Sequence, residues 1–185
     1  MTTFTIPGLS DAQGRKIADL LQTQLSTYND LHLTLKHVHW NVVGPNFIGV
    51  HEMLDPQVEL VRGYADEVAE RIAALGRSPQ GTPGAILKDR TWEDYSVGRD
   101  TVQAHLAALN LVYDGVIADI RTAIKTLDDL DLVSQDLLIG HAGELEKFQW
   151  FVRAHLENSG GQLAGGDAST EKKAAAQAKK KAPVK

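Results

Sequence analysis

The stretch HVHWNVVGPNFIGVHEMLD, residues 37–55, decides the fold because it holds a sharp break between two helical patterns. Gly44-Pro45 cannot continue a helix, and Asn46 directly afterwards is a residue type that caps the start of a new one. The same stretch carries two histidines and an aspartate, His39, His51 and Asp55, whose role depends on how the two helices meet.

Apolar residues recur at spacings of three and four in four long segments of the chain. They predict helices over about residues 10–42, 46–75, 97–127 and 132–157, the first with Ser10 as its N-cap. Residues 76–95 are rich in Gly, Pro, Ser and Thr and form a long connection with a short helix at 84–88. This order predicts an all-α, ferritin-like four-helix bundle with a long crossover between its second and third helices.

The size and composition of the chain exclude several classes of protein. Its 185 residues suffice for one domain with a substantial core, and the absence of cysteine excludes disulfides, thiolate metal sites and cysteine nucleophiles. No apolar run approaches the roughly 18 residues of a membrane span, and the N-terminal MTTFTIPGLS lacks a secretory signal pattern. We therefore expect a cytoplasmic protein with no membrane association.

Charge is distributed unevenly along the chain. The formal net charge is −5, yet the last fifteen residues, EKKAAAQAKKKAPVK, hold six lysines and one glutamate. The composition changes at Asn158 to Gly, Ser, Ala and Lys, which predicts a folded domain over residues 1–157 and a disordered tail over residues 158–185. An acidic body with a basic tail predicts two partners of opposite sign, cations and a polyanion.

The second predicted helix carries two pairs of candidate metal ligands at i, i+4 spacing, His51 with Asp55 and Asp66 with Glu70. Each pair lies within about 40° on one helix face, so its two side chains can hold one ion. Imidazole and carboxylate suit iron, manganese or zinc, and a carboxylate-rich set favours iron.

Each pair also has a plain structural interpretation. Asp55 followed by Pro56 fits an N-cap with proline at the first helical position. Asp66 and Glu70 can pair with neighbouring arginines, Arg62 and Arg71, or simply face solvent. The spacing of the pairs does not choose between these interpretations.

The distance between the pairs limits how they can act together. Asp55 and Asp66 are eleven residues apart, or roughly 16 Å along a continuous helix, so one chain cannot bring both pairs onto one ion. Two chains packed antiparallel across a two-fold axis can, and a C2 contact would create the site twice. The chain has no Glu-x-x-His sequence, which argues against a ferritin-type di-iron centre inside each bundle.

HWNVVGPNFIGVHEMLD, followed by YADEVAER at residues 64–71, closely resembles the signature of the Dps family, the DNA-binding proteins from starved cells. The resemblance covers roughly residues 10–157, including the crossover and KFQWF at 147–151. It implies a hollow homo-dodecamer that oxidises Fe(II) at two-fold interfaces, preferably with hydrogen peroxide, and stores ferric mineral inside. The matched ligand positions are His39, His51 and Asp55 of one subunit and Asp66 and Glu70 of its partner.

Two further roles follow from the resemblance. Trp40 adjoins His39 and is placed to give an electron to a stray oxidant, although packing at the dimer interface explains this aromatic equally well. The family forms a three-fold pore near the start of the last helix, where Asp136 matches best and Asp131 less closely as carboxylates of an iron entrance. Acidic residues that complement a helix dipole are the plain alternative.

The basic tail predicts a second activity. Its lysines are not interleaved with aromatics, so we expect sequence-independent binding to the phosphates of double-stranded DNA, weakened by salt and strengthened by many tails on one shell. These lysines are Lys172, Lys173, Lys179, Lys180, Lys181 and Lys185. The plain alternative is a solvated tail that aids solubility.

The sequence as a whole predicts an iron-storing ferroxidase that also binds DNA and protects it from oxidative damage. Its location would then be the cytoplasm, in association with the nucleoid. The alternative is a nucleoid-organising DNA-binding shell whose metal site is mainly structural.

Overall fold

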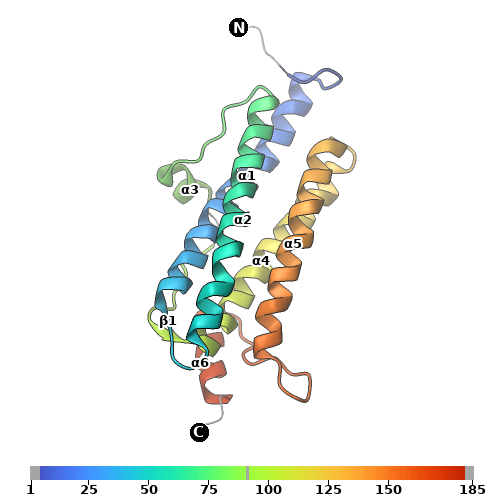
Figure 1. Ribbon diagram of the computed structural model, residues 1–185. Helices are drawn as coiled ribbons and strands as arrows, with labels where there is room; N and C mark the ends of the chain where they lie inside the picture. The colour runs from blue at the N-terminus through green and yellow to red at the C-terminus, as the bar shows by residue number, and fades with distance from the viewer. Residues whose placement is uncertain (1–4, 91, 182–185) are drawn as a thin grey trace.

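A computed structural model describes residues 5–90 and 92–181 and confirms the all-α bundle (Figure 1). Its helices are α1 Asp11–Asn41, α2 Phe47–Ala74, α3 Pro83–Asp89, α4 Val102–Leu127, α5 Leu132–Leu156 and α6 Glu171–Lys181. Two strands of two residues each, β1 Val42–Val43 and β2 Asp100–Thr101, pair in parallel. Across residues 5–90 and 92–181, none of the helices combines the length and the apolar character needed to cross a membrane.

The helix ends follow the local chemistry of their capping residues. Ser10 caps α1 through a capping box, in which the backbone N–H of Gln13 donates to Ser10 Oγ and the Gln13 side chain accepts from the Ser10 N–H. Thr101 caps α4, which begins five residues later than the periodicity predicts. The reason is tertiary, because residues 93–98 have no regular secondary structure and the chain then forms β2, which pairs with β1.

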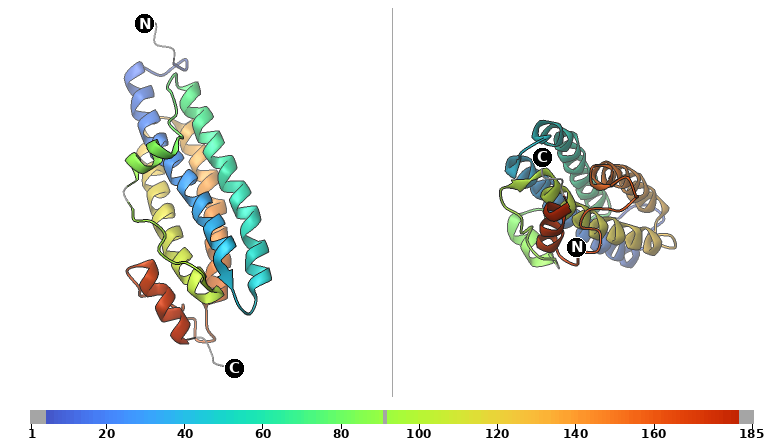
Figure 2. Two further views of the ribbon diagram at one scale, coloured as in Figure 1. Left: turned by 90° about the vertical axis from the view of Figure 1, so that its left-hand side faces the viewer. Right: turned by 90° about the horizontal axis from the view of Figure 1, so that it is seen from below.

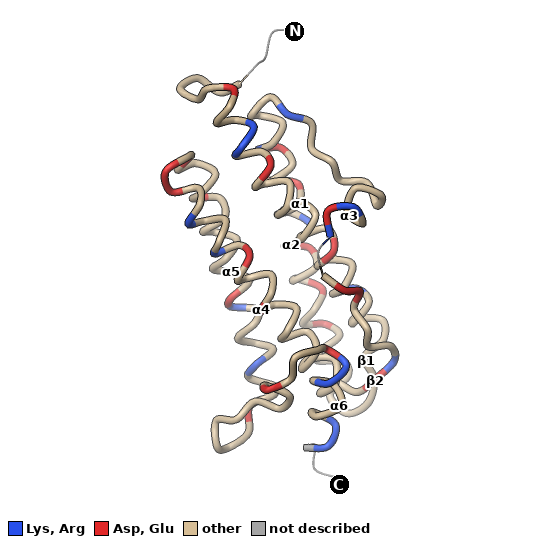
Figure 3. Tube along the Cα trace, turned by 180° about the vertical axis from the view of Figure 1, so that it is seen from behind, with Lys and Arg blue, Asp and Glu red and all other residues tan. Residues whose placement is uncertain are grey.

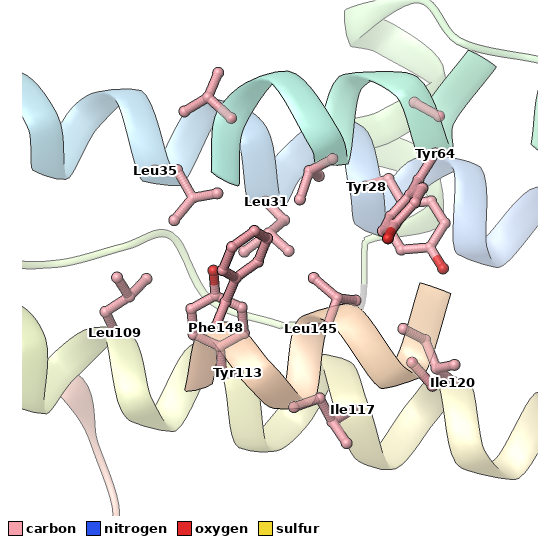
Figure 4. Close-up of a cluster of buried hydrophobic side chains, with 14 of the residues drawn as sticks. Tyr28, Leu31, Leu35, Tyr64, Leu109, Tyr113, Ile117, Ile120, Leu145 and Phe148 are labelled. Atoms are coloured by element: carbon pink, nitrogen blue, oxygen red, sulfur yellow. The ribbon is translucent and has the colours of Figure 1, made fainter. Parts of the chain in front are cut away.

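Two helical hairpins make up the bundle. The α1/α2 hairpin packs on the α4/α5 hairpin, and the crossover that carries α3 runs along the outside from the end of α2 to the start of α4 (Figure 2). The interface between the hairpins is filled by aliphatic side chains and by the aromatic rings of Tyr28, Tyr64, Tyr113 and Phe148 (Figure 4). Burial of this apolar surface is the main driving force for folding.

The C-terminal segment differs from the predicted disordered tail. Glu171–Lys181 forms α6, which packs against α4 through Ala174, Ala175 and Ala178. Alanine has the highest helix propensity, and its small side chain allows the two helices to approach closely. Lys179 Nζ lies 2.6 Å from Asp100 Oδ2, and Glu171 Oε2 accepts from the Ser96 N–H at 2.9 Å. The low-complexity composition therefore concealed an amphipathic helix.

The approach of the chain to α6 depends on Gly165. Its φ of +82° lies in the left-handed region, and a Cβ there would meet the carbonyl oxygen of Ala174 at 2.9 Å and Ala107 Cβ at 3.1 Å. A side chain at this position therefore conflicts with both the backbone conformation and the docked helix.

Gly165→Ala should loosen α6 from α4. The left-handed conformation alone costs alanine about 1–2 kcal/mol, and the contact with Ala174 adds to this cost. We expect faster hydrogen exchange and proteolysis within residues 158–181 and little change in the bundle. Gly143→Ala is the matched control, because Gly143 lies in α5 with open space around its Cβ position. Unchanged exchange in the tail of the Gly165 variant would contradict this account.

Stability should fall at acidic pH because His105 is buried. Burial lowers the pKa of His105 below its ordinary value of 6.5. As the pH falls below about 6.5, the unfolded chain takes up a proton that the folded chain does not, so the free energy of unfolding decreases. We expect urea unfolding curves to show this loss between about pH 7 and pH 5, and His105→Gln to lose less than the parent. Parallel pH profiles for parent and variant would show that His105 is not a source of the effect.

Candidate metal centre

The turn between α1 and α2 brings the end of one helix against the start of the next. Gly44 has a φ of +94° and Asn46 a φ of +63°, and the Phe47 N–H donates to the Gly44 carbonyl at 3.1 Å. Asn46 occupies the N-cap position, as predicted, but its side chain makes no capping hydrogen bond. The reversal of the chain therefore depends on backbone conformations that Gly and Asn adopt readily.

His39 in the last turn of α1 and His51 near the start of α2 lie face to face across this turn. Their rings stack with a centroid separation of 3.6 Å and an interplanar angle of 25°. Each ring also bonds to the backbone of the other residue: His39 Nδ1 donates to the His51 carbonyl at 3.0 Å, and His51 Nδ1 donates to the His39 carbonyl at 2.9 Å.

These two hydrogen bonds fix which nitrogen of each ring carries a hydrogen. A carbonyl oxygen only accepts, so each Nδ1 must carry one, and the neutral form of each ring then has its lone pair on Nε2. Burial lowers the pKa of His39, which favours the neutral form. A histidine that donates one N–H to a backbone carbonyl while presenting the other nitrogen is the usual arrangement of a metal-ligating imidazole.

Asp55 lies one turn further along α2, beside the two rings. Its Oδ1 is 3.3 Å from His39 Nδ1 and 3.0 Å from Lys36 Nζ. The hydrogen bond from Lys36 is the largest cause that lowers the pKa of Asp55. The carboxylate is therefore ionised and exposed, in the form that binds a cation. Lys36 was not anticipated from the sequence, although its i, i+3 spacing to His39 placed it on the same helix face.

Asp55 is not an N-cap, so that alternative is wrong. Helix α2 runs without interruption from Phe47 to Ala74 and contains Pro56 in its interior. Asp55 therefore projects from the body of a continuous helix, and the roughly 16 Å rise from Asp55 to Asp66 holds.

Asp66 and Glu70 form the second acidic pair and are both exposed on α2. The arginines that were candidate partners are engaged elsewhere: Arg62 Nη1 lies 3.0 Å from Glu59, and Arg71 Nη2 lies 2.6 Å from Asp131. In the part of the chain that the structure describes, Asp66 and Glu70 have no ion pair. Exposed carboxylates at i, i+4 without a counter-ion are free to bind a cation from solution.

One chain does not complete a metal site by itself. Among residues 5–90 and 92–181, no group of three or more His, Asp or Glu side chains is arranged to hold a metal ion. His39, His51 and Asp55 come together at one end of α2, while Asp66 and Glu70 lie along the same helix towards its other end. The geometry of the single chain leaves open the half-site arrangement that the sequence predicts.

Large apolar side chains are exposed around the candidate half-site. Trp40 is 70% exposed, and Ile48 is 58% exposed beside Phe47, which itself contacts His51 with ring centroids 5.0 Å apart. Trp40 is a candidate from the sequence, whereas the exposure of Phe47 and Ile48 follows only from the packing of α2. An apolar patch beside charged ligands is typical of a protein interface.

The two candidate pore carboxylates differ in their surroundings. Asp131 is the N-cap of α5, where its Oδ2 accepts from the Ser134 N–H at 3.2 Å and pairs with Arg71. Burial opposes its ionisation, but hydrogen bonds from Ser134 and Arg71 outweigh this and lower the pKa of Asp131. Its geometry fits the capping alternative, whereas Asp136 is exposed on α5 beside the exposed apolar residues Val133 and Ile139.

The lysines of the C-terminal segment occupy the solvent face of α6. Lys172, Lys173 and Lys180 are exposed, and Lys179 pairs with Asp100. Figure 3 shows this basic helix at the end of a body whose acidic residues are spread along the other helices. Lys181 ends α6, and Lys185 lies outside the described residues.

Comparison with known proteins agrees with this fold. The ferritin-like domain family model matches residues 18–159. The DNA protection during starvation protein of Mycolicibacterium smegmatis is 80% identical over 181 residues, which cover 98% of this chain and 99% of that protein. The chain belongs to the Dps family of ferritin-like proteins.

Solved Dps structures share the fold. Mycobacterium smegmatis Dps has a TM-score of 0.91 and 81% identity, covering 92% of this chain and 97% of that one. Dps from Microbacterium arborescens, solved in a high iron form, has a TM-score of 0.74 and 33% identity, covering 79% of this chain and 95% of that one. The Dps fold is therefore retained well below the identity of the mycobacterial relatives.

Proposed function

We propose that the protein is an iron-storage and detoxification protein that oxidises Fe(II), preferably with hydrogen peroxide. The observation that carries this proposal is the reciprocal hydrogen bonding of His39 and His51, which leaves an Nε2 lone pair on each ring beside the ionised Asp55. Two imidazoles and several carboxylates form a donor set suited to iron. A Dps relative has been solved in a high iron form, which supports the choice of metal.

The complete site would lie between two chains. His39, His51 and Asp55 of one subunit would face Asp66 and Glu70 of a two-fold partner, because the continuous helix α2 holds the two groups too far apart within one chain. The exposed apolar side chains of Trp40, Phe47 and Ile48 would become buried in that contact. Repetition of two-fold and three-fold contacts would close a hollow homo-dodecamer, inside which ferric mineral accumulates.

The chemistry required of the protein is limited. Fe(II) is the substrate, and the carboxylates stabilise the higher charge of the ferric product more than that of the ferrous ion. Two ferrous ions supply the two electrons that hydrogen peroxide needs to become water, so no hydroxyl radical is released. Trp40 is placed beside His39 to give an electron to an oxidant that escapes this route, and Asp136 is the better candidate for the iron entrance.

The second part of the proposed function is non-specific binding of double-stranded DNA through the C-terminal lysines. Exposed lysines on α6 can neutralise phosphates without reading bases, and twelve such helices on one shell would act together. The acidic body opposes any other route to DNA. The name of the mycobacterial relative, a DNA protection during starvation protein, supports a protective role in the stressed cell, in the cytoplasm and associated with the nucleoid.

An alternative is a nucleoid-organising shell whose metal site is mainly structural. The ion pair between Lys36 and Asp55 favours this alternative to a degree, since a positive charge beside a ligand opposes metal binding. The kinetics of iron oxidation separate the two functions, because a structural site would not accelerate the reaction.

Replacing both His51 and Asp55 by alanine in one variant should slow Fe(II) oxidation by hydrogen peroxide at least about 100-fold. Loss of a residue that only hydrogen-bonds to a metal ligand already lowers metal affinity or activity about 10–100-fold, and this change removes two ligands themselves. Stopped-flow absorbance measures the rate, and size-exclusion chromatography shows whether the shell still assembles. Glu59→Ala, on the same helix but paired with Arg62, is the matched control. An assembled double variant that oxidises iron at the parent rate would refute the site.

Mixed subunits test whether ligands come from both chains. A shell reassembled from a His39→Ala subunit and a Glu70→Ala subunit contains dimers in which one of the two sites keeps every ligand. We expect a mixed dimer to recover about half of the parent activity, whereas each variant alone is inactive. No recovery in verified mixed dimers would place all ligands within one chain.

Deletion of residues 171–185 should abolish DNA retardation and leave iron oxidation intact. The deletion removes all six tail lysines, while the predicted ligands lie in α1 and α2. Gel retardation at rising salt checks the electrostatic origin, because binding through phosphates weakens steeply with ionic strength. DNA binding that survives the deletion would locate the binding surface on the body.

A further inference from the structure

A chain of hydrogen bonds crosses the core of the bundle and ends at Glu67, the residue next to the candidate ligand Asp66. Tyr28 of α1, His141 of α5 and Glu67 of α2 form it, with Tyr28 Oη 3.1 Å from His141 Nδ1 and His141 Nε2 2.9 Å from Glu67 Oε2. Tyr28 has no exposed surface and His141 is 2% exposed, whereas the Glu67 side chain is 53% exposed. The chain therefore connects a fully buried phenol to a carboxylate at the surface.

The direction of each hydrogen bond follows from the chemistry of its ends. The Glu67 carboxylate oxygen is the acceptor of its hydrogen bond with His141, so His141 Nε2 carries the hydrogen and donates. Burial lowers the pKa of His141, so the ring is neutral and its Nδ1 is an acceptor. Tyr28 therefore donates its hydroxyl hydrogen to His141, and the phenol has a base within hydrogen-bond reach.

This arrangement suits oxidation of the phenol by one electron. A phenol that loses an electron becomes strongly acidic, and in a buried site the proton needs an acceptor at once. Burial raises the pKa of Tyr28, which excludes prior ionisation to phenolate as the route. His141 can take the proton, and the Glu67 carboxylate stabilises the imidazolium that results.

We propose that Tyr28 is a redox-active tyrosine that supplies single electrons to strong oxidants, with His141 as its proton acceptor and Glu67 as the stabilising carboxylate. When one ferrous ion reduces hydrogen peroxide, the products are a ferric ion, hydroxide and one hydroxyl-radical equivalent. Tyr28 gives its electron to that equivalent, which becomes a second hydroxide, while the phenolic proton moves from Oη to His141 Nδ1. A later ferrous ion returns the electron, and the proton moves back to Tyr28.

The other tyrosines lack this arrangement. Tyr113 is also fully buried, but it donates to the amide oxygen of Gln57 at 2.6 Å, and an amide does not take a proton. Tyr95 bonds to His105 Nδ1 at 3.0 Å, but within residues 5–90 and 92–181 no carboxylate is hydrogen-bonded to His105. Tyr28 is thus the tyrosine best equipped for coupled loss of an electron and a proton.

An aromatic contact extends the Tyr28 site towards the candidate ligands. Tyr64 of α2 stacks on His141 at a centroid separation of 3.8 Å. The rings of Tyr64 and Tyr28 lie beside each other (Figure 4), with their centroids 5.7 Å apart. Tyr64 lies six residues before Glu70 on α2, or about 9 Å along the helix axis. Tyr64 therefore joins the ring of Tyr28 to the helix that carries Glu70. The link to iron chemistry rests on the proposed function, whereas the redox property of Tyr28 does not.

A photochemical oxidant tests Tyr28 without iron. The assembled, metal-free protein is mixed with ruthenium tris-bipyridine and persulfate and flashed, and tyrosyl radical is followed by its absorbance and by EPR. We expect Tyr28→Phe to lose most of the tyrosyl signal, and His141→Gln to slow its formation at least about tenfold, since a positioned base contributes factors of this size or larger. Glu67→Gln, which keeps the shape of the side chain, should lower the yield less.

Matched controls separate the proposal from a purely structural role of the hydrogen bonds. Tyr113→Phe removes an equally buried hydroxyl and should leave the signal unchanged, and circular dichroism with size-exclusion chromatography confirms that each variant is folded and assembled. The parent should also show a solvent deuterium isotope effect that His141→Gln lacks. A full tyrosyl signal in Tyr28→Phe, or a signal in the parent that is lost equally in Tyr113→Phe, overturns the proposal.

A second arm adds less than one ferrous ion per predicted site before hydrogen peroxide, with hydroxyl radical measured by spin trapping. Tyr28→Phe should release more trapped radical than the parent, and Tyr113→Phe should not. If the parent protein forms the radical photochemically but does not accelerate iron oxidation, the redox role of Tyr28 is supported and the proposed ferroxidase activity is refuted. Equal trapping in the parent and Tyr28→Phe, despite rapid iron oxidation, would refute the protective role of Tyr28.

Discussion

Two hydrogen bonds between the end of α1 and the start of α2 connect the fold of this protein to its chemistry. Because α1 ends at Asn41, the carbonyl of His39 is one of the last four that have no partner within the helix, and His51 Nδ1 supplies one. The reverse bond, from His39 to the His51 carbonyl, fixes the other ring. The bonds that complete the helix end thus also leave both Nε2 atoms available. In the proposed function, a substitution that disturbs this turn would affect folding and metal binding together.

The remaining site residues are arranged by the straightness of α2. A continuous helix separates Asp55 from Asp66 by a distance that no side-chain rotation closes, so the single chain keeps the two groups of candidate ligands apart. Exposed apolar side chains at the α1/α2 end and the exposed carboxylates of Asp66 and Glu70 further along are both features that a second subunit would cover. In the proposed function, activity therefore depends on assembly, because the subunit contact that buries the apolar surface also completes the ligand set.

The C-terminal segment shows how composition can conceal structure. Alanine and lysine in EKKAAAQAKKK are compatible with a disordered tail, but their spacing places Ala174, Ala175 and Ala178 on one face of a helix. Small apolar contacts of this kind hold a helix weakly, because each buries little surface. Helix α6 packs through its alanines and exposes its lysines, so its positive charge remains available to a polyanion. Its attachment to α4 depends on the close approach of the chain that Gly165 permits.

The sequence by itself determined the four long helices and the crossover with its short helix, because these follow from periodicity and capping residues. It also supplied the candidate ligands, from i, i+4 spacing within one helix and from the family resemblance. It also identified the turn at Gly44-Pro45 and the family to which the chain belongs. Only the tertiary structure decided which alternatives hold: that Asp55 lies within a continuous helix, that Asp131 caps α5, and that α6 packs on α4. The chain of Tyr28, His141 and Glu67 belongs to this second group. Its members are 39 and 74 residues apart in sequence and come from three helices, so no local pattern joins them, and their contact arises from the packing of the bundle.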